Sequence, residues 1–196
     1  MAFNISRFKS TFEGLGGPAK ANLFEVMMTN PKWMNTATEA DKGKFDARTF
    51  TMFCSAITFP GVAINTTNYD YVGQLSKIIP SAITTPGPIT ATFICDSDHH
   101  TLRFFHYWIR HVLNYSSAGG IHSEWKEKLP HEVGFRDDYC CDIEIKHYST
   151  DSNPRSYYSA MLQKSYPISV SGIDLAWDGA DQYLTIQVQF AFDDYE

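Results

Sequence analysis

The C-terminal end of the chain alternates between apolar and polar residues more strictly than any other part of the sequence. This pattern runs from Gln182 to Phe192. A period of two residues is typical of a β-strand with one face in a core and the other in water or an interface. The chain is therefore predicted to fold around a half-buried sheet. The apolar set is Leu184, Ile186, Val188, Phe190 and Phe192, and the polar set is Tyr183, Thr185, Gln187 and Gln189.

The preceding segment, Tyr157–Ala176, is predicted to be the partner strand, with one interruption. Its apolar residues change from one parity to the other at Gly172, which suits a β-bulge or bend. The polar segment Trp177–Asp181 supplies a turn. Residues Tyr166–Glu196 are therefore predicted to form a strand pair.

Further segments are rich in β-branched and aromatic residues, and each predicts a strand. In Tyr139–Tyr148 the polarity also alternates, so that Asp142 and Glu144 lie on one face and Ile143 on the other. The segment Val62–Pro80 is predicted to be extended, followed by a turn region over Ser81–Pro88. The remaining predicted strands are Asn22–Thr29, Phe50–Phe59 and Ile89–Cys95, and Met34–Thr49 is predicted to be a loop.

The pattern between Asp96 and Asn114 has the period of a helix instead. Ser97 or Asp98 is predicted to cap its N-terminus, and Asp96 also suits the helix dipole. This is the one long helix predicted; a short amphipathic helix is predicted over Ala2–Glu13. The apolar face of the long helix consists of Leu102, Phe105, Trp108, Ile109 and Val112.

The sum of these elements is a mainly β protein with antiparallel strands and one helix. Its 196 residues have the length of a single domain, 1–196. No segment is apolar enough over a sufficient length to cross a membrane, and the N-terminus does not resemble a signal peptide. The edges of such a sheet must be paired or covered, which an oligomer continuing the sheet between subunits would achieve.

The histidines and cysteines do not predict a metal site. Helical ligand pairs need a spacing of three or four residues to share a face, and no two of the helix histidines have it. The cysteines include no CxxC pair, and they are predicted to be reduced and mostly buried. No cofactor is predicted. The residues concerned are His99, His100, His106 and His111, and Cys54, Cys95, Cys140 and Cys141.

Enzymatic and nucleic-acid-binding functions have equally little support. The sequence contains no nucleophile elbow and no phosphate-binding loop. Asp96, Asp98 and His99 are explained by helix capping. The net charge of −6 offers a polyanion no electrostatic attraction. The composition instead favours a structural protein past which a polyanion can move.

Four segments, taken in order, resemble the tail tube family of contractile-tailed bacteriophages. The segment YPISVSGIDLAWDGADQYLTIQVQFAFDDYE resembles the closing strand pair of that family, with Pro167 before a strand and Trp177-Asp178 at its end. The others are Asn22–Val26, Phe53–Gly61 and Thr92–Trp108, the last with His99, Phe105 and Trp108 at family-like positions.

This resemblance implies a fold and a role. The fold is of the tail-tube or secretion-tube type: two packed antiparallel sheets forming a barrel-like core with one flanking α-helix. Family members form hexameric rings that stack into a tube within a contractile sheath, and the tube carries DNA and the tape measure protein. The chain is then a non-enzymatic virion component, assembled in the host cytoplasm, whose partners are itself, the sheath, the baseplate and the tape measure protein.

Two alternatives remain open at this stage. Baseplate proteins that initiate or cap the tube share the fold, and Pro167–Ser171 suits them equally well. The second alternative is a small β-sandwich that binds a sugar or a peptide, which the abundance of aromatic residues would suit. Relative to a minimal tube subunit, the chain also carries predicted loop insertions at 31–48 and 116–135.

The resemblance also suggests two sets of assembly residues. Tyr69–Ile79 resembles the long hairpin with which family members reach a neighbouring subunit or ring; the alternative is an ordinary hairpin packed on its own domain. A channel for DNA should repel phosphate or be neutral to it, so polar strand residues are candidates for its lining. The interface candidates are Tyr69, Tyr71, Val72, Leu75, Lys77, Ile78 and Ile79, and the lumen candidates are Asp142, Glu144, Thr185, Gln187 and Gln189.

Overall fold

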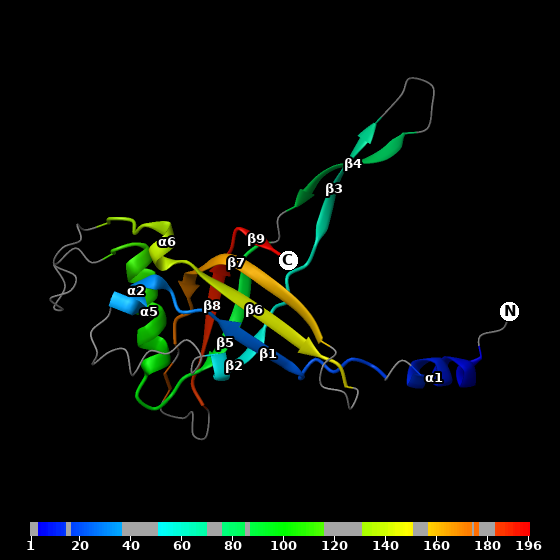
Figure 1. Ribbon diagram of the computed structural model, residues 1–196, viewed down its shortest axis with the longest axis horizontal. Coiled ribbons are helices and arrows are strands. Elements are labelled where there is room, and N and C mark those ends of the chain that lie inside the picture. The colour runs from blue at the N-terminus through cyan, green and yellow to red at the C-terminus, as the bar shows by residue number, and fades with distance from the viewer. Residues whose placement is uncertain are drawn as a thin grey trace.

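The computed structural model of the chain describes residues 4–14, 17–36, 51–69, 76–84, 87–115, 131–150, 157–173, 175–176 and 183–196. Within these ranges it contains a seven-stranded antiparallel sheet that bends into two layers, a separate two-stranded hairpin and four helices (Figure 1). The strands are β1 Phe24–Met28, β2 Cys54–Ile57, β3 Ala63–Tyr69, β4 Lys77–Thr84, β5 Ile89–Ile94, β6 Cys141–Tyr148, β7 Tyr157–Val170, β8 Thr185–Ala191 and β9 Asp194–Tyr195. The helices are α1 Ile5–Gly14, α2 Lys32–Thr36, α5 His100–Val112 and α6 Arg136–Tyr139.

Strand β7 belongs to both layers of the sheet. Up to Ser165 it pairs with β6, and from Tyr166 onward it pairs with β8. Next to this change of partner, Lys164 has a positive φ of 52°, a conformation that turns the chain direction. The strand order is β1-β6-β7-β8-β5-β2, with β9 beside β7. The predicted pair of antiparallel sheets is confirmed, and the two sheets share one long, bent strand.

The core lies between these two layers and takes its side chains from alternate strand positions. Ile143 and Ile145 come from β6, whereas Ile186, Val188 and Phe190 come from β8, and all are at most 2% exposed. Burying such a side chain stabilises the fold by roughly 1.5–3 kcal/mol. The alternation predicted for both strands is therefore confirmed: the polar residues between these positions face outward.

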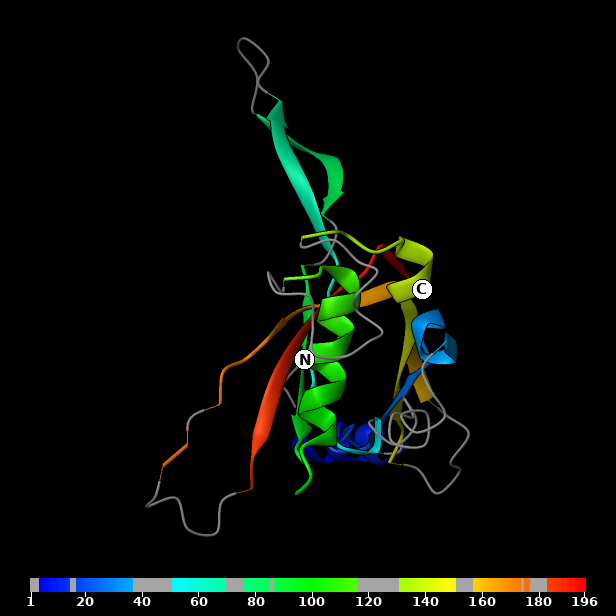
Figure 2. The same cartoon turned by 90° about the vertical axis from the view of Figure 1, so that its left-hand side faces the viewer.

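Helix α5 lies along one side of the two layers, on the left in Figure 1 and nearest the viewer in Figure 2, where β8 appears on one side of it and β1 and β6 on the other. Its Phe104, Phe105 and Trp108 are fully buried. The ring centroid of Phe105 lies 4.8 Å from that of Phe93 and 6.0 Å from that of Phe190. These aromatic pairs join the helix to the β5–β8 layer.

The buried face of α5 is rotated relative to the predicted one. Phe105 and Trp108 are buried as predicted, but Leu102, Ile109 and Val112 are only partly buried, and Thr101 and Phe104 are buried instead. Leu102 lines a small surface pocket with Arg103 and Tyr107. The spacing of apolar residues allowed either face, and the space between the layers accepts the larger ring of Phe104.

The first described residues of the predicted insertion at 31–48 lie in the core. Pro31, Trp33 and Met34 are buried, and the helix α2 contains the beginning of the predicted loop Met34–Thr49. The prediction of a loop is therefore wrong for residues 34–36. The adjacent large apolar side chains of Trp33 and Met34 were the sequence signal for burial. Residues 37–48, and residues 116–130 of the other predicted insertion, lie outside the described residues.

Several predicted strand ends also differ from those observed. The strand predicted over Phe50–Phe59 is shorter, because Thr51 and Met52 are helical. Tyr139 ends α6 instead of beginning β6. Strand β7 stops at Val170, so Gly172 follows the strand, and the register shift lies between Pro167 and Ser169. Of the bulge or bend predicted at Gly172, the bulge is therefore wrong, because the strand has already ended there.

Strands β3 and β4 form a hairpin that projects away from the two-layered body (Figures 1 and 2). Strand β4 extends to Thr84, into the turn region predicted over Ser81–Pro88, so that prediction is wrong for residues 81–84. Pro80 lies inside β4 opposite Thr66, beside a register shift. Proline is tolerated in a strand at such an irregularity because a ladder hydrogen bond is already missing there.

Candidate assembly surfaces

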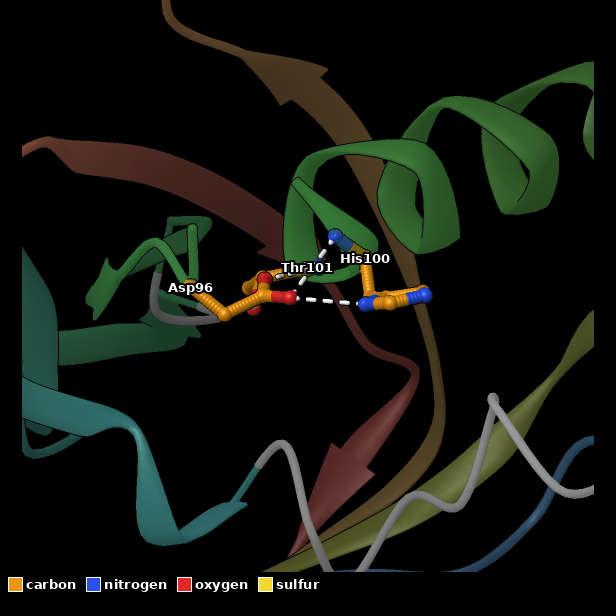
Figure 3. Close-up of polar contacts among 3 residues, drawn as sticks. All are labelled: Asp96, His100 and Thr101. Carbon is orange, nitrogen blue, oxygen red and sulfur yellow. Dashed lines mark hydrogen bonds and ion pairs between the residues drawn. The ribbon is translucent and has the colours of Figure 1, made fainter. Parts of the chain in front are cut away.

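The carboxylate of Asp96 fixes the start of α5 (Figure 3). Its Oδ2 accepts a hydrogen bond from the backbone N–H of His100 at 3.1 Å and lies 2.8 Å from His100 Nδ1. Its Oδ1 accepts hydrogen bonds from the backbone N–H of Thr101 at 3.0 Å and from Thr101 Oγ1 at 3.1 Å. These bonds satisfy backbone donors that the first helical turn leaves without intrahelical partners.

The prediction that Ser97 or Asp98 caps α5 is therefore wrong, and Asp96 does so. The intervening His99 has a left-handed φ of 57°, which brings the chain back so that the Asp96 side chain faces the first turn. Burial by itself would raise the pKa of Asp96. The hydrogen bonds from Thr101 and His100 outweigh that effect and lower the pKa below its usual value. This cluster is a structural cap.

The predicted absence of a metal site can be compared with side-chain positions only for the described residues. Among them, no three His, Cys, Asp or Glu side chains are placed to hold a metal ion. His111 stacks on Trp33 with ring centroids 4.4 Å apart. All four cysteines are free, and burial raises the pKa of Cys54 to about 11 and that of Cys141 well above its usual value.

The layer made by β2, β5, β8 and the end of β7 has an outer face without charged residues. None of the strand segments 54–57, 89–94, 166–170 and 185–191 contains an acidic, basic or histidine residue. Gln187 lies opposite Thr92, and Gln189 lies opposite Thr90. The hydroxyl of Ser169 donates to Gln189 Oε1 at 3.1 Å. These pairs form a neutral polar surface, which we call the neutral face.

The outer face of the β1–β6 layer differs in charge. Glu25 lies opposite Lys146, and Met27 lies opposite Glu144. Lys146 Nζ lies 3.3 Å from Glu144 Oε1. The predicted lumen candidates therefore fall into two groups: Thr185, Gln187 and Gln189 are exposed on the neutral face, whereas Asp142 and Glu144 come from β6, on the other side of β7. The structure does not bring them together on one strand pair.

A groove of about 740 Å³ runs along β1 and the residues before and at the start of β2. Three carboxylate residues lie in its wall, namely Glu25, Asp142 and Glu144, and no basic residue is among its described lining residues. The apolar part of the wall is rich in methionine. The remaining lining residues are Phe24, Val26, Met27, Met28, Thr29, Asn30, Thr51, Met52, Cys54 and Met161.

The projecting hairpin carries exposed aliphatic residues along both strands. Ile78 is 71% exposed and Ile79 is 45% exposed, and Tyr69 and Lys77 are exposed as well. The hairpin therefore does not pack on its own domain through these described residues. Tyr71, Val72 and Leu75, the other interface candidates, lie outside the described residues. Large exposed apolar side chains in such an arm are typical of interaction surfaces.

The chain thus combines a two-layered β fold with a projecting apolar arm and a broad uncharged face. The family described as phage tail tube protein matches residues 19–196, which is most of the chain. The chain therefore belongs to the phage tail tube protein family. A comparison with curated protein sequences gives no match.

Solved structures of contractile injection systems have a similar fold. A chain of the anti-feeding prophage tube-terminating cap aligns with a TM-score of 0.55 at 13% identity, over 91% of this chain and 89% of that chain. A chain of an extended sheath–tube complex of an extracellular contractile injection system aligns with a TM-score of 0.53 at 12% identity, over 100% of this chain and 97% of that chain.

A third similar structure comes from the anti-feeding prophage baseplate. One of its chains aligns with a TM-score of 0.52 at 12% identity, over 91% of this chain and 94% of that chain. At these identities the similarity shows the fold alone. In the described part of the chain, no helix is both long enough and apolar enough to span a bilayer.

Proposed function

We propose that the chain is the structural subunit of a phage tail tube, in which hexameric rings stack around a channel for DNA. The observation that carries this proposal is the neutral face. A channel wall repeated in many rings multiplies any fixed charge, so that even one lysine per subunit would bind the phosphate backbone along its whole length. A wall of Thr, Ser and Gln side chains provides hydration without that attraction.

The neutral face is preferred over the β1–β6 face as the channel lining. Thr185, Gln187 and Gln189 belong to strands without charged residues, whereas Glu144 is already paired with Lys146. Mixed charges at close range are typical of contact surfaces between proteins, where they determine register. We therefore assign the lining to Thr185, Gln187 and Gln189 and place Asp142 and Glu144 outside it.

The hairpin β3–β4 supports the assembly part of the proposal. Its exposed Ile78 and Ile79 would be buried when it contacts a neighbouring subunit or ring, which favours association. The sheath, the baseplate and the tape measure protein are the further proposed partners. The role is structural, without catalysis or a cofactor, and the protein is a virion component assembled in the host cytoplasm.

The test is a three-dimensional reconstruction of the purified chain after assembly at high concentration by electron cryomicroscopy. We expect stacked rings with sixfold symmetry whose inner wall consists of β8 and β5. Dispersed monomers at every concentration would refute the proposal of a tube subunit. Rings whose inner wall carries Asp142 and Glu144 would refute the assignment of the neutral face.

A baseplate initiator or cap of the tube is the second candidate function. It is favoured by the similarity of the fold to chains of a baseplate and of a tube-terminating cap. The number of copies of the chain in each virion separates the two roles, because a tube needs many rings and an initiator or cap only one or a few. Quantitative mass spectrometry of purified particles, scaled to the major capsid protein, measures it.

A further inference from the structure

The N-terminal helix α1 presents an apolar face at the surface. Asn4 caps it, since Asn4 Oδ1 accepts a hydrogen bond from the N–H of Ser6 at 2.9 Å. Ile5, Phe8 and Phe12 lie at helical spacing and are 62%, 51% and 40% exposed. The ring centroids of Phe8 and Phe12 are 5.1 Å apart, so that the two rings form one continuous apolar surface.

This helix lies apart from the tube-family portion of the chain. It projects from the body at the end opposite α5 (Figure 1), and none of its residues is buried. The family match begins at residue 19, after the helix has ended. An amphipathic helix of ten residues is only marginally stable alone in water and is stabilised chiefly by packing of its apolar face.

The groove along β1 has the complementary chemistry. It combines exposed methionine side chains, of which Met27 is 38%, Met52 86% and Met161 41% exposed, with the carboxylates of Glu25, Asp142 and Glu144. Methionine is flexible and polarisable and adapts to aromatic rings placed against it. A groove of about 740 Å³ lies within the range of protein sites that bury a ligand of several side chains.

The charges of the helix and the groove are opposite. The helix carries Arg7 and Lys9 within its first five residues, with one acidic residue, Glu13, near its end. The carboxylates of the groove are already engaged in part: Tyr148 donates a hydrogen bond to Glu25, the backbone N–H of Lys164 donates to Asp142, and Glu144 contacts Lys146. Their charge nevertheless exceeds that of Lys146, so the groove attracts a basic helix.

We propose that α1 of one subunit docks in the β1 groove of a second copy of the chain. Ile5, Phe8 and Phe12 contact the methionine side chains, while Arg7 and Lys9 lie near the carboxylates. This inference rests on the proposed tube function, because it needs neighbouring subunits in a regular assembly. It adds a second link between subunits, distinct from the hairpin β3–β4, and it is built by a segment outside the family match.

Site-specific photo-crosslinking of the full chain tests the inference. Phe12 is replaced by benzoylphenylalanine, and isotopically heavy and light preparations are mixed before assembly. We expect heavy–light crosslinked peptides that join residue 12 to Met27, Met52 or Met161. Heavy–light crosslinks that map only to the hairpin or to other surfaces would overturn the inference. Crosslinks found only within one chain would overturn it too.

A pair of matched variants tests the same contact by assembly. Phe12→Glu and Met161→Glu should each raise the concentration needed for assembly by about tenfold or more, as for residues at the centre of an interface. The double variant should lose less free energy of assembly than the sum of the losses of the two single variants, because each single variant already removes the same contact. The controls are Ser10→Glu, on the opposite side of α1, and Ser159→Glu, exposed on β7 but not among the groove residues.

Sedimentation of the same samples separates this inference from the proposed function. Rings that form equally well with Phe12→Glu and with wild type would overturn the docking of α1 and leave the tube function intact. Wild-type chains that stay monomeric at every concentration would overturn both. Residues 12 and 161 are exposed at the surface, so we expect both variants to fold as the wild type does. Circular dichroism of each variant checks that expectation.

Discussion

The indole N–H of Trp108 donates a hydrogen bond of 2.6 Å to the backbone carbonyl oxygen of Tyr139. Trp108 is fully buried in α5, and Tyr139 ends α6 two residues before β6 begins at Cys141. One bond therefore joins the helix α5 to the beginning of the β1–β6 layer. Because the site is buried, the carbonyl has no access to water if its donor is removed.

The variant Trp108→Phe keeps an aromatic ring at this position but removes the donor. We expect a loss of about 1–3 kcal/mol in the free energy of unfolding from the unsatisfied carbonyl, with a further loss from the smaller ring. Urea denaturation followed by circular dichroism measures it. The exposed His106→Gln on the same helix is the control, expected within about 0.5 kcal/mol of wild type. A value for Trp108→Phe equal to that of the control would contradict the role of this bond.

Removal of the carboxylate of Asp96 should destabilise the protein in a pH-dependent way. Asp96→Ala should cost about 0.5–2 kcal/mol at neutral pH, because the first turn of α5 loses its cap. Hydrogen bonds hold the folded-state pKa of Asp96 below its unfolded value. The carboxylate therefore stabilises the fold above about pH 4, and this contribution is lost as the pH falls toward the folded-state pKa.

The difference between Asp96→Ala and wild type should therefore narrow from about pH 7 to about pH 3. Urea titrations at a series of pH values measure the narrowing. Asp98→Ala is the matched control, because Asp98 is an exposed neighbour in the same turn. A difference that stays constant over this range would show that the charge of Asp96 is not what stabilises the helix start.

Gly134 should not tolerate a side chain. A Cβ atom at this position would overlap the backbone carbonyl oxygen of His111, and the N–H of Gly134 donates to the carbonyl of Val112 at 2.9 Å. Gly134→Ala must move one backbone segment, at a cost of about 1–3 kcal/mol. Gly172→Ala, where no heavy atom lies within 4 Å, should stay within about 0.5 kcal/mol of wild type. Equal melting temperatures for the two variants would contradict the contact.

The thiol of Cys54 should react slowly in the folded protein. Burial raises its pKa to about 11 from an ordinary value of 9.0. At neutral pH this leaves roughly a hundredfold less of the reactive thiolate than an ordinary cysteine has. Labelling with a thiol reagent, mapped by mass spectrometry, should accelerate with increasing pH and on unfolding in urea. Rapid labelling of Cys54 in the folded protein near neutral pH would refute this.

The hairpin should matter for assembly and not for the stability of the subunit. Ile78→Ser with Ile79→Ser should prevent ring formation, because apolar surface that assembly buries is removed. The free energy of unfolding should change little, since both residues are exposed. Thr67→Ser, on the facing strand opposite Ile79, is the control. Assembly of the double variant at the wild-type concentration would exclude these two residues from the interface.

The sequence by itself determined the strands and their faces. Ile186, Val188 and Phe190 alternate with Gln187 and Gln189, and this order fixes which side chains are buried, because successive strand residues point to opposite faces. The absence of charge on β5 and β8 is likewise a property of the sequence. The resemblance of four sequence segments to the tail tube family is confirmed by the family match over residues 19–196.

Only the tertiary structure decided how these elements meet. The bend beside Lys164 places the two halves of β7 in different layers, and so it separates Glu144 from Gln187. The sequence pattern of α5 fitted two overlapping faces, and the space between the layers selected the one with Phe104. Local periodicity cannot specify such choices, because they depend on the shape of a core built by segments distant in the chain. The left-handed turn at His99, which gives the cap to Asp96 instead of Asp98, was equally beyond the local pattern.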